Sequence, residues 1–282
     1  MATRVATGRL YVVPTPIGNL DDITVRALRV LSEATLVLSE DTRHTRTLLS
    51  RHGIKARLLS YHQHNKLSRI DQVLEILAQG DVALVSNAGT PSISDPGFEL
   101  IRAAIVAGIE IDVLPGASAV ITAVVAAALP ASGFLFAGFL PRSAKARRER
   151  LASLAETPYS LVFFEAPHRL TQTLQDALLV LGDREAVIAR ELTKLHQEIR
   201  RERLSDLVAH YAESEIRGEV TLVIAGAGEI SSDSLSEALA DLRRRKSQGE
   251  DRHSAMAAVR QEHGAPRNAL YRAWLDAPDP DV

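Results

Sequence analysis

The chain has 282 residues, of which 46% are hydrophobic, and its formal net charge is −2. This length is enough for two ordinary cores, and the nearly neutral charge excludes a globally basic nucleic-acid binder, so any RNA contact has to come from local patches. The chain lacks cysteine, an export signal and an apolar run long enough for a membrane span, so we expect a cytoplasmic protein without disulfides.

The first half alternates short β-rich runs with amphipathic helical runs. The expected strands cover residues 10–13, 35–38, 57–60, 82–86 and 111–114. Apolar residues recur at helical spacing between Leu67 and Leu77, and Gly80 follows as a stop signal. This rhythm predicts an α/β domain with a largely parallel sheet, which we place at residues 1–125.

The pattern changes after Ala131 and again after Gly228. Residues 126–230 combine β-rich and helical runs and predict a second α/β domain. Residues 231–282 predict a small helical appendage, whose helices around His263–Pro266 have the spacing of a helix-turn-helix that contacts RNA. A short helical hairpin that packs on the body is the alternative. The acidic tail, 276–282, is expected to fray.

The segment after the first expected strand excludes a dinucleotide-binding turn. It has the sequence PTPIGNL, with two prolines and the single glycine Gly18. The G-x-G-x-x-G pattern of Rossmann folds is therefore absent, and the chain has no P-loop. The fold predicted is α/β but not Rossmann-like.

Polar turns follow several of the expected strands, which is where α/β proteins bind ligands. Residues 81–97 form the sequence DVALVSNAGTPSISDPG, in which Gly89 allows close backbone approach and Pro91 fixes a bend. Residues 38–49 form LSEDTRHTRTLL; Asp41 is suited to capping a helix whose outer face is solvated, or alternatively Glu40 and Asp41 engage a ribose while Arg43 and Arg46 meet phosphates.

Other charged clusters leave structural and functional interpretations open. His62 and His64 have no convincing third ligand, so we assign no metal and expect a polar loop facing substrate. Arg190 and Glu191 could form a structural ion pair. Basic runs at 142–150 and 243–246 predict either solvated helix faces or a local RNA footprint.

Seven segments together resemble the tetrapyrrole-methylase-fold enzymes, and specifically their bacterial branch of small-subunit rRNA (cytidine-2′-O)-methyltransferases. They are TPIGNLDDIT, LSEDTR, SNAGTPSISDPG, PGASA, FFEAPHR, ARELTK and GEVTLVIAG, in matching order between Leu10 and Gly226. The resemblance implies a two-domain fold with S-adenosylmethionine as cofactor. It also implies methylation of a cytidine 2′-hydroxyl in the decoding region of 16S rRNA, within the small ribosomal subunit, by a homodimer.

The resemblance also assigns site residues. It places the cofactor in the cleft between the domains, against Pro16, Ile17, Ala88, Gly89, Thr90, Ile93, Ser118, Ala119, Glu165, Ala166 and Leu192. The more frequent Gly-Gly-Asp of the family is replaced by Ala88-Gly89-Thr90, so the usual aspartate role is unassigned. The cations expected to meet RNA are Arg43, Arg46, Arg147, Arg148, His168, Arg169, Arg190 and Lys194.

We take Glu40, Asp41, Glu165 and Lys194 as candidates for a catalytic base or an orienting group, from their charge and strand-end location. Two alternatives remain. One is methylation of a tetrapyrrole ring carbon, which needs a broad apolar trough that an aromatic content of 4% disfavours. The other is an RNA-binding accessory without turnover.

Overall fold

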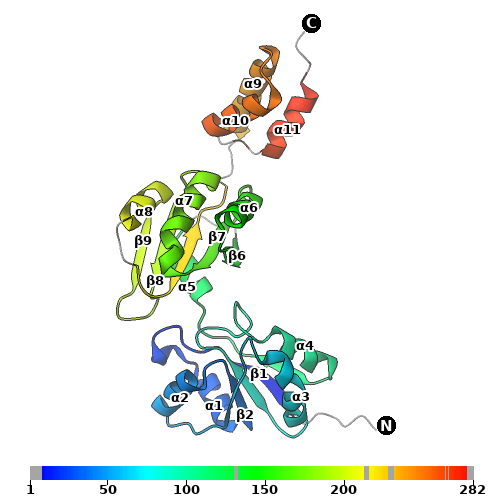
Figure 1. Cartoon of the computed structure of the whole chain (residues 1–282), viewed down its shortest axis with the longest axis vertical. Coiled ribbons are helices and arrows are strands. Elements are labelled where there is room, and N and C mark those ends of the chain that lie inside the picture. Colours follow the sequence, from blue (N-terminus) through cyan, green and yellow to red (C-terminus); the bar gives the residue numbers. More distant parts are fainter. Residues whose placement is uncertain are drawn as a thin grey trace.

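The structure is a computed structural model that describes residues 8–129, 133–212, 216–227, 232–263, 265 and 267–277. Two five-stranded sheets, each covered by helices, and a helical unit follow one another along the long axis of the molecule (Figure 1). The predicted α/β architecture with a helical C-terminal part is confirmed. None of the described helices is both long enough and apolar enough to cross a bilayer.

The first sheet is entirely parallel. Its strands are β1 (Arg9–Val12), β2 (Leu36–Ser39), β3 (Leu58–Ser60), β4 (Val82–Val85) and β5 (Glu110–Val113), in the order β3-β2-β4-β1-β5. All five predicted strands are confirmed to within two residues. The central strands β2 and β4 are buried throughout because helices cover both faces of the sheet.

Alternate residues of the central strands pack on opposite layers of helices. Leu36, Leu38, Val82 and Leu84 join a core with α3 (Lys66–Leu77) and α4 (Phe98–Val106). Val37, Ala83 and Val85 pack instead against α1 (Val25–Glu33) and α2 (Thr42–Arg51). A 3-10 turn at Leu20–Asp22 precedes α1. Because the strands are parallel, the polar segments after β1, β2 and β4 meet at one edge of the sheet.

The second sheet is mostly antiparallel. It contains β6 (Phe134–Phe139), β7 (Ser160–Glu165), β8 (Glu185–Arg190), β9 (Glu198–Arg203) and β10 (Val220–Ile224), in the order β6-β7-β10-β8-β9, and only β6 and β7 pair in parallel. One face packs on α6 (Ala144–Leu154), α7 (Leu170–Leu181), which follows a 3-10 turn at Pro167–Arg169, and α8 (Leu204–Tyr211).

The other face of the second sheet is covered by α5 (Ala119–Ala127). Val120 and Ala123 of this helix pack with Val162, Val187 and Val223. The helix follows the last strand of the first sheet in sequence, yet its contacts are with β8, β9 and β10. The division that we expected at residues 125–126 would cut this helix, so we draw it before Ala119.

The C-terminal unit consists of α9 (Ser232–Ser247), α10 (Arg252–His263) and α11 (Arg267–Asp276). Its helices contact one another around their own small core, which includes Leu242, Val259 and Leu270. Figure 1 shows this unit beyond the second sheet, at the end far from the first. The proposed turn at 264–266 falls within the described residues only at Ala265, and the tail at 278–282 lies outside them, so both expectations stay predictions.

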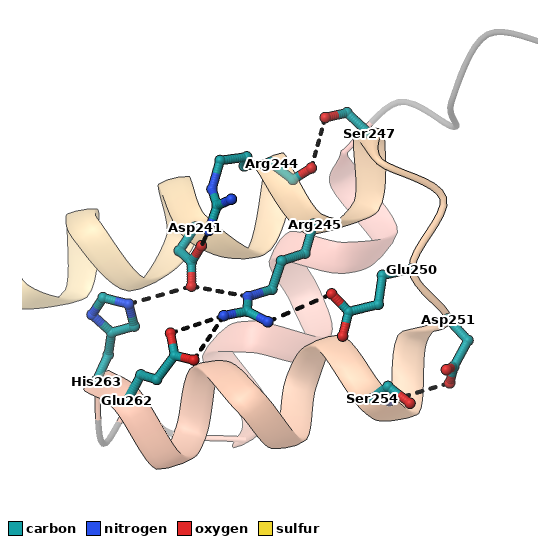
Figure 2. A network of polar contacts seen from close by, with 9 residues as sticks. All are labelled: Asp241, Arg244, Arg245, Ser247, Glu250, Asp251, Ser254, Glu262 and His263. Atoms are coloured by element: carbon teal, nitrogen blue, oxygen red, sulfur yellow. Dashed lines mark hydrogen bonds and ion pairs between the residues drawn. The ribbon is translucent and has the colours of Figure 1, made fainter.

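Ion pairs hold α9 against α10 (Figure 2). The guanidinium of Arg245 lies 3.1 Å from Asp241 and 2.8 Å from Glu262, and His263 approaches Asp241 at 3.4 Å. Lys246 is buried and donates to the carbonyls of Trp274 and Ala277. Half of the basic run 243–246 therefore stabilises this unit, and only Arg243 and Arg244 are exposed.

Candidate functional site

A cavity of about 450 Å³ lies between the two sheets. The first sheet contributes the segments after β2 and β4, at residues 40, 87–90 and 93–95. The second contributes the start of α5, the end of β7 and the start of β10, at residues 118–120, 164–167 and 218–221. The volume is in the range of small-molecule sites.

Hydrogen bonds fix the turn after β4 against the loop after β1. Thr15 and Gly89 exchange two backbone hydrogen bonds of 2.9 Å, and the Ser86 hydroxyl donates to the Gly89 carbonyl at 3.1 Å. Gly89 has a φ of +75°, which glycine adopts without strain. Ser92 and Ser94 also have positive φ, of 72° and 66°. Non-glycine residues in this region are strained and concentrate at functional sites.

Most of the residues assigned to the cofactor by resemblance border this cavity. They are Ile17, Ala88, Gly89, Thr90, Ile93, Ser118, Ala119, Glu165 and Ala166. Ser118 caps α5, with its hydroxyl accepting from the Ile121 amide, and the start of this helix offers unpaired amides to a polar ligand. Pro16 borders a neighbouring cavity instead, and Leu192 is buried in the core beneath α5.

A second cavity of about 340 Å³ adjoins the first, and both are bordered by Ile17, Asn87, Ala88 and Glu219. Its wall combines apolar residues, among them Leu20 and Leu48, with the polar side chains of Asp41, His44 and Lys194. The loops on its two sides touch, because the Asn19 amide donates to the Thr193 hydroxyl at 3.0 Å. Gly18 fits closely there: a Cβ atom would lie 2.5 Å from Cγ of Lys194.

Of the four catalytic candidates, Glu40 borders the main cavity with the least engaged carboxylate. It accepts one hydrogen bond, of 3.0 Å, from the Asn87 amide. Asn87 also accepts from the Asp41 backbone amide at 3.1 Å, so it ties the two acidic residues together. Asp41 itself caps α2, and the guanidinium of Arg43 holds the pKa of its carboxyl well below the usual range. This is the helix-cap interpretation.

The other two candidates have structural partners. The Glu165 carboxylate is fully buried and accepts from the Thr173 hydroxyl at 2.6 Å and from the Ala166 amide at 2.8 Å. Burial alone would lower the pKa of Lys194, but hydrogen bonds to Glu191 and Glu219 raise it above the ordinary lysine value. Lys194 therefore stays protonated at neutral pH, where it can orient a carboxylate or meet a phosphate but cannot accept a proton.

The cations expected to meet RNA separate into two groups. Arg43, Arg46 and His168 are exposed. Arg169 donates to the Leu140 carbonyl at 2.7 Å, Arg190 pairs with Glu198 at 2.8 Å, and Lys194 pairs with Glu191 and Glu219 as described above.

The assignment of Arg147 to the RNA surface is corrected by the structure. Its side chain is 4% exposed and pairs with Asp176, which is also buried, at 2.6 Å. Arg148 pairs with the other oxygen of the same carboxylate and is half exposed. Arg147 therefore belongs to the contact between α6 and α7.

The sequence analysis did not single out Asn87, Asp95 or Glu219, which all border the main cavity. Burial, together with the negative charges of Glu40 and Glu219, raises the pKa of Asp95 to about 6. Asn87 had a usable signal, since it follows β4 at the carboxyl edge of a parallel sheet. Asp95 and Glu219 lie in two of the segments that carry the resemblance, but their local sequence does not show that the fold brings them together at one cavity.

Comparisons with known proteins agree with this architecture. The model of the family Tetrapyrrole (Corrin/Porphyrin) Methylases matches residues 9–208. Among solved structures, the methyltransferase CobJ matches with a TM-score of 0.60 and 23% identity, covering 78% of this chain and 95% of its own. A Thermus thermophilus uroporphyrin-III C-methyltransferase complexed with S-adenosylhomocysteine matches with a TM-score of 0.55 and 22% identity, covering 77% and 97%.

Relatives of higher identity share one name, ribosomal RNA small subunit methyltransferase I. The protein of Micromonospora olivasterospora is 47% identical over 96% of this chain and 87% of its own. That of Thermotoga maritima is 49% identical over 78% of this chain and 99% of its own, and that of Escherichia coli O157:H7 is 44% identical over 95% of both. The chain therefore belongs to the tetrapyrrole methylase family and, within it, to the group of the ribosomal RNA small subunit methyltransferases I.

Proposed function

We propose that this chain transfers a methyl group from S-adenosylmethionine to the 2′-hydroxyl of a cytidine in the decoding region of 16S rRNA. Its substrate is the RNA of the small ribosomal subunit in the cytoplasm. The observation that carries the proposal is the pair of adjoining cavities between the sheets, both with mixed apolar and polar walls, the second of which includes Asp41, His44 and Lys194. The shared name of the relatives supports the ribosomal substrate.

The residues of the main cavity fit S-adenosylmethionine. The backbone at 88–90 and the amides at the start of α5 suit the polar groups of the cofactor, and Val120, Phe139 and Phe164 provide an apolar wall. Glu40 and Glu219 give the cavity a negative potential, which favours a cationic ligand. When bound, the cofactor supplies an electrophilic methyl group on a positively charged sulfur.

The second cavity suits the acceptor nucleoside, whose hydroxyl has to reach the methyl group in the adjoining main cavity. His44, Asp41 and Lys194 offer donors and acceptors there, and α2 begins at its border. The exposed Arg43 and Arg46 lie on the first two turns of this helix, where they can meet phosphates and hold the RNA strand in position. The chain's main tasks in this reaction are to align the acceptor hydroxyl with the methyl group and to take up its proton.

Methylation of a tetrapyrrole ring carbon is the second candidate, favoured by the resemblance of the fold to CobJ and to the uroporphyrin-III methyltransferase. These structures share less than 25% identity with the chain, so they speak to the fold alone. The polar side chains of Asp41, His44 and Lys194 in the second cavity, with the exposed Arg43 and Arg46 on α2, favour a nucleoside flanked by phosphates over a tetrapyrrole.

We also propose that two copies of the chain pair, as the family resemblance implies. Val113 on the edge strand β5 and Ile121 and Val125 on α5 are apolar and more than half exposed, so both elements have apolar surface that a second copy could bury. Light scattering in solution tests the pairing; the mass of a single chain at micromolar concentration contradicts it.

The proposal is tested with purified protein, radiolabelled S-adenosylmethionine and small ribosomal subunits from cells that lack this enzyme. Nuclease digestion and nucleoside mass spectrometry then identify the product. Labelled 2′-O-methylcytidine is the expected result. Label on a base, or no transfer by protein that binds the cofactor, contradicts the proposal, and transfer to uroporphyrinogen would support the second candidate. Failure to bind the cofactor at all would indicate the non-catalytic accessory.

A further inference from the structure

Three acidic side chains from distant segments border the main cavity. Glu40 follows β2, Asp95 lies in the loop between β4 and α4, and Glu219 precedes β10 of the second sheet. Each sheet therefore contributes carboxylates to one small volume. Only Glu40 among them was a candidate on sequence grounds.

The three carboxylates differ in how they are held. Glu40 accepts from Asn87 at 3.0 Å, and Glu219 pairs with Lys194 at 3.1 Å. Asp95 interacts with the Ser86 hydroxyl, and no cation pairs with it among the residues that the structure describes. Asp95 is therefore the carboxylate whose charge is least compensated.

The backbone around Asp95 is held in an uncommon conformation. Ser92 and Ser94 have φ values of 72° and 66°, and Gly97, which follows the turn, has a φ of 156°. At Gly97 a Cβ atom would lie 3.1 Å from Leu84 and 3.2 Å from Ser92, so the loop is packed tightly on the end of β4. A strained, tightly packed loop fixes the position of the side chain it carries.

The surroundings of Asp95 make its carboxylate more basic than usual. Burial disfavours its charged form, and Glu40 and Glu219 repel it from two sides, so its pKa rises to about 6. The charged groups around it are these two carboxylates and, through Glu219, the ammonium of Lys194. At pH 7 such a group is mostly ionised, yet it binds a proton far better than an exposed aspartate does.

We propose that Asp95 accepts the proton of the acceptor hydroxyl, an inference that rests on the function proposed above. As the hydroxyl oxygen bonds to the methyl carbon, the carbon–sulfur bond breaks and leaves its electron pair on sulfur. The hydroxyl proton passes to the Asp95 carboxylate, which later releases it to water. Glu40, held by Asn87, and Glu219, held by Lys194, are positioning residues that keep Asp95 basic.

The first test needs no cofactor. Carboxyl carbon NMR of the protein with labelled aspartate should show a resonance, absent from Asp95→Asn, that titrates near pH 6. In Glu40→Gln the midpoint of this resonance should move down by about half a pH unit or more, because a repelling charge is gone. A midpoint below about pH 5 in the unmodified protein overturns the inference, since a carboxylate that titrates there has an ordinary aspartate pKa.

The second test is single-turnover methyl transfer to small subunits between pH 5 and pH 8. The unmodified rate should rise up to about pH 6 and then level off. Asp95→Asn should lower the plateau by about 10²–10⁴-fold and remove this rise, and Asp95→Glu should restore part of the rate. Asp71→Asn, the same change on an exposed position of α3, serves as control and should match the unmodified protein.

Binding measurements separate this role from others. Asp95→Asn should bind S-adenosylmethionine and S-adenosylhomocysteine with affinities within about two-fold of those of the unmodified protein. A tenfold loss of affinity for S-adenosylmethionine alone, which carries the positive charge, would make Asp95 its counter-ion and overturn the inference. A rate within about five-fold of normal for Asp95→Asn, with the unmodified protein active on rRNA, refutes the inference alone. No transfer to rRNA by the unmodified protein refutes the proposed function instead.

Discussion

Removing the carboxylate of Asp176 should destabilise the second domain strongly. The side chains of Arg147 and Asp176 are 4% and 5% exposed. Their contacts include Arg147 Nε to Oδ2 at 2.7 Å and Nη2 to Oδ2 at 2.6 Å, and Arg147 also donates to the Arg142 carbonyl at 3.1 Å. Asp176→Ala leaves a guanidinium buried without its counter-charge, which costs about 3–5 kcal/mol.

Replacing both partners should cost much less. In Arg147→Met with Asp176→Leu, no buried charge remains, and such exchanges are often neutral or stabilising when packing is kept. We therefore expect the double variant to recover most of the loss of Asp176→Ala. The difference between the two variants shows how much of the loss comes from the uncompensated charge of Arg147.

Native-state hydrogen exchange of α6 and α7, read by mass spectrometry, is the suitable assay. The only tryptophan, Trp274, lies in α11, so its fluorescence reports the C-terminal unit and not this contact. If Asp176→Ala lowered the free energy of opening of α6 and α7 by less than about 1 kcal/mol, a buried, structural role for Arg147 would be refuted, since an exposed ion pair contributes that much. If Asp176→Ala weakened RNA binding while α6 and α7 kept their protection from hydrogen exchange, Arg147 would belong to the RNA surface after all.

Three further outcomes are expected. The folded-state pKa of Asp95, about 6, exceeds the ordinary aspartate value of 3.8, so its charge costs stability above pH 6 and not below pH 4. After allowing for its partial exposure, Asp95→Asn should stabilise the protein by about 1–2 kcal/mol at pH 7.5 and by nothing at pH 3.5, as denaturant unfolding at the two pH values would show. Arg46→Ala should weaken binding to small subunits and lower the salt dependence of the binding constant by about one phosphate contact. Arg29→Ala on α1 is the control, and equal salt slopes for the two variants would contradict a phosphate contact of Arg46. Truncation after Ala227 should leave exchange protection of both sheets unchanged, because α9, α10 and α11 pack on one another; faster exchange in α7 would reveal an unrecognised contact.

Local patterns predicted the first sheet well because its strands are short apolar runs ended by turn residues. The expected boundary at residues 125–126 divides α5 for a physical reason: Ala119–Ala127 is apolar except for Thr122, so its sequence does not indicate which sheet it covers. The segment after β4 was expected at a ligand site because polar turns follow the strands of α/β proteins there, whereas the segment after β1 was placed there by the family resemblance.

The sequence was least informative about the candidate site where a distant partner decides the role of a side chain. Arg147 lies within a basic run, and its counter-charge is 29 residues away. Glu165 ends β7, as a catalytic residue could, but its carboxylate is buried on Thr173 of α7. The basicity of Asp95 depends on Glu40 and Glu219, which only the folded chain brings near it.

The central claim is that the main cavity between the sheets binds the cofactor. Calorimetric titration of S-adenosylmethionine into the unmodified protein and into Ala119→Leu tests it, because Ala119 borders the cavity at the start of α5 and a leucine there occupies cofactor space. Ala257→Leu on the exposed side of α10 is the control. We expect Ala119→Leu alone to lose at least about 100-fold in affinity, equivalent to about 2.7 kcal/mol, with its thermal midpoint unchanged. Binding by Ala119→Leu within about two-fold of the unmodified protein would place the cofactor elsewhere and contradict the account.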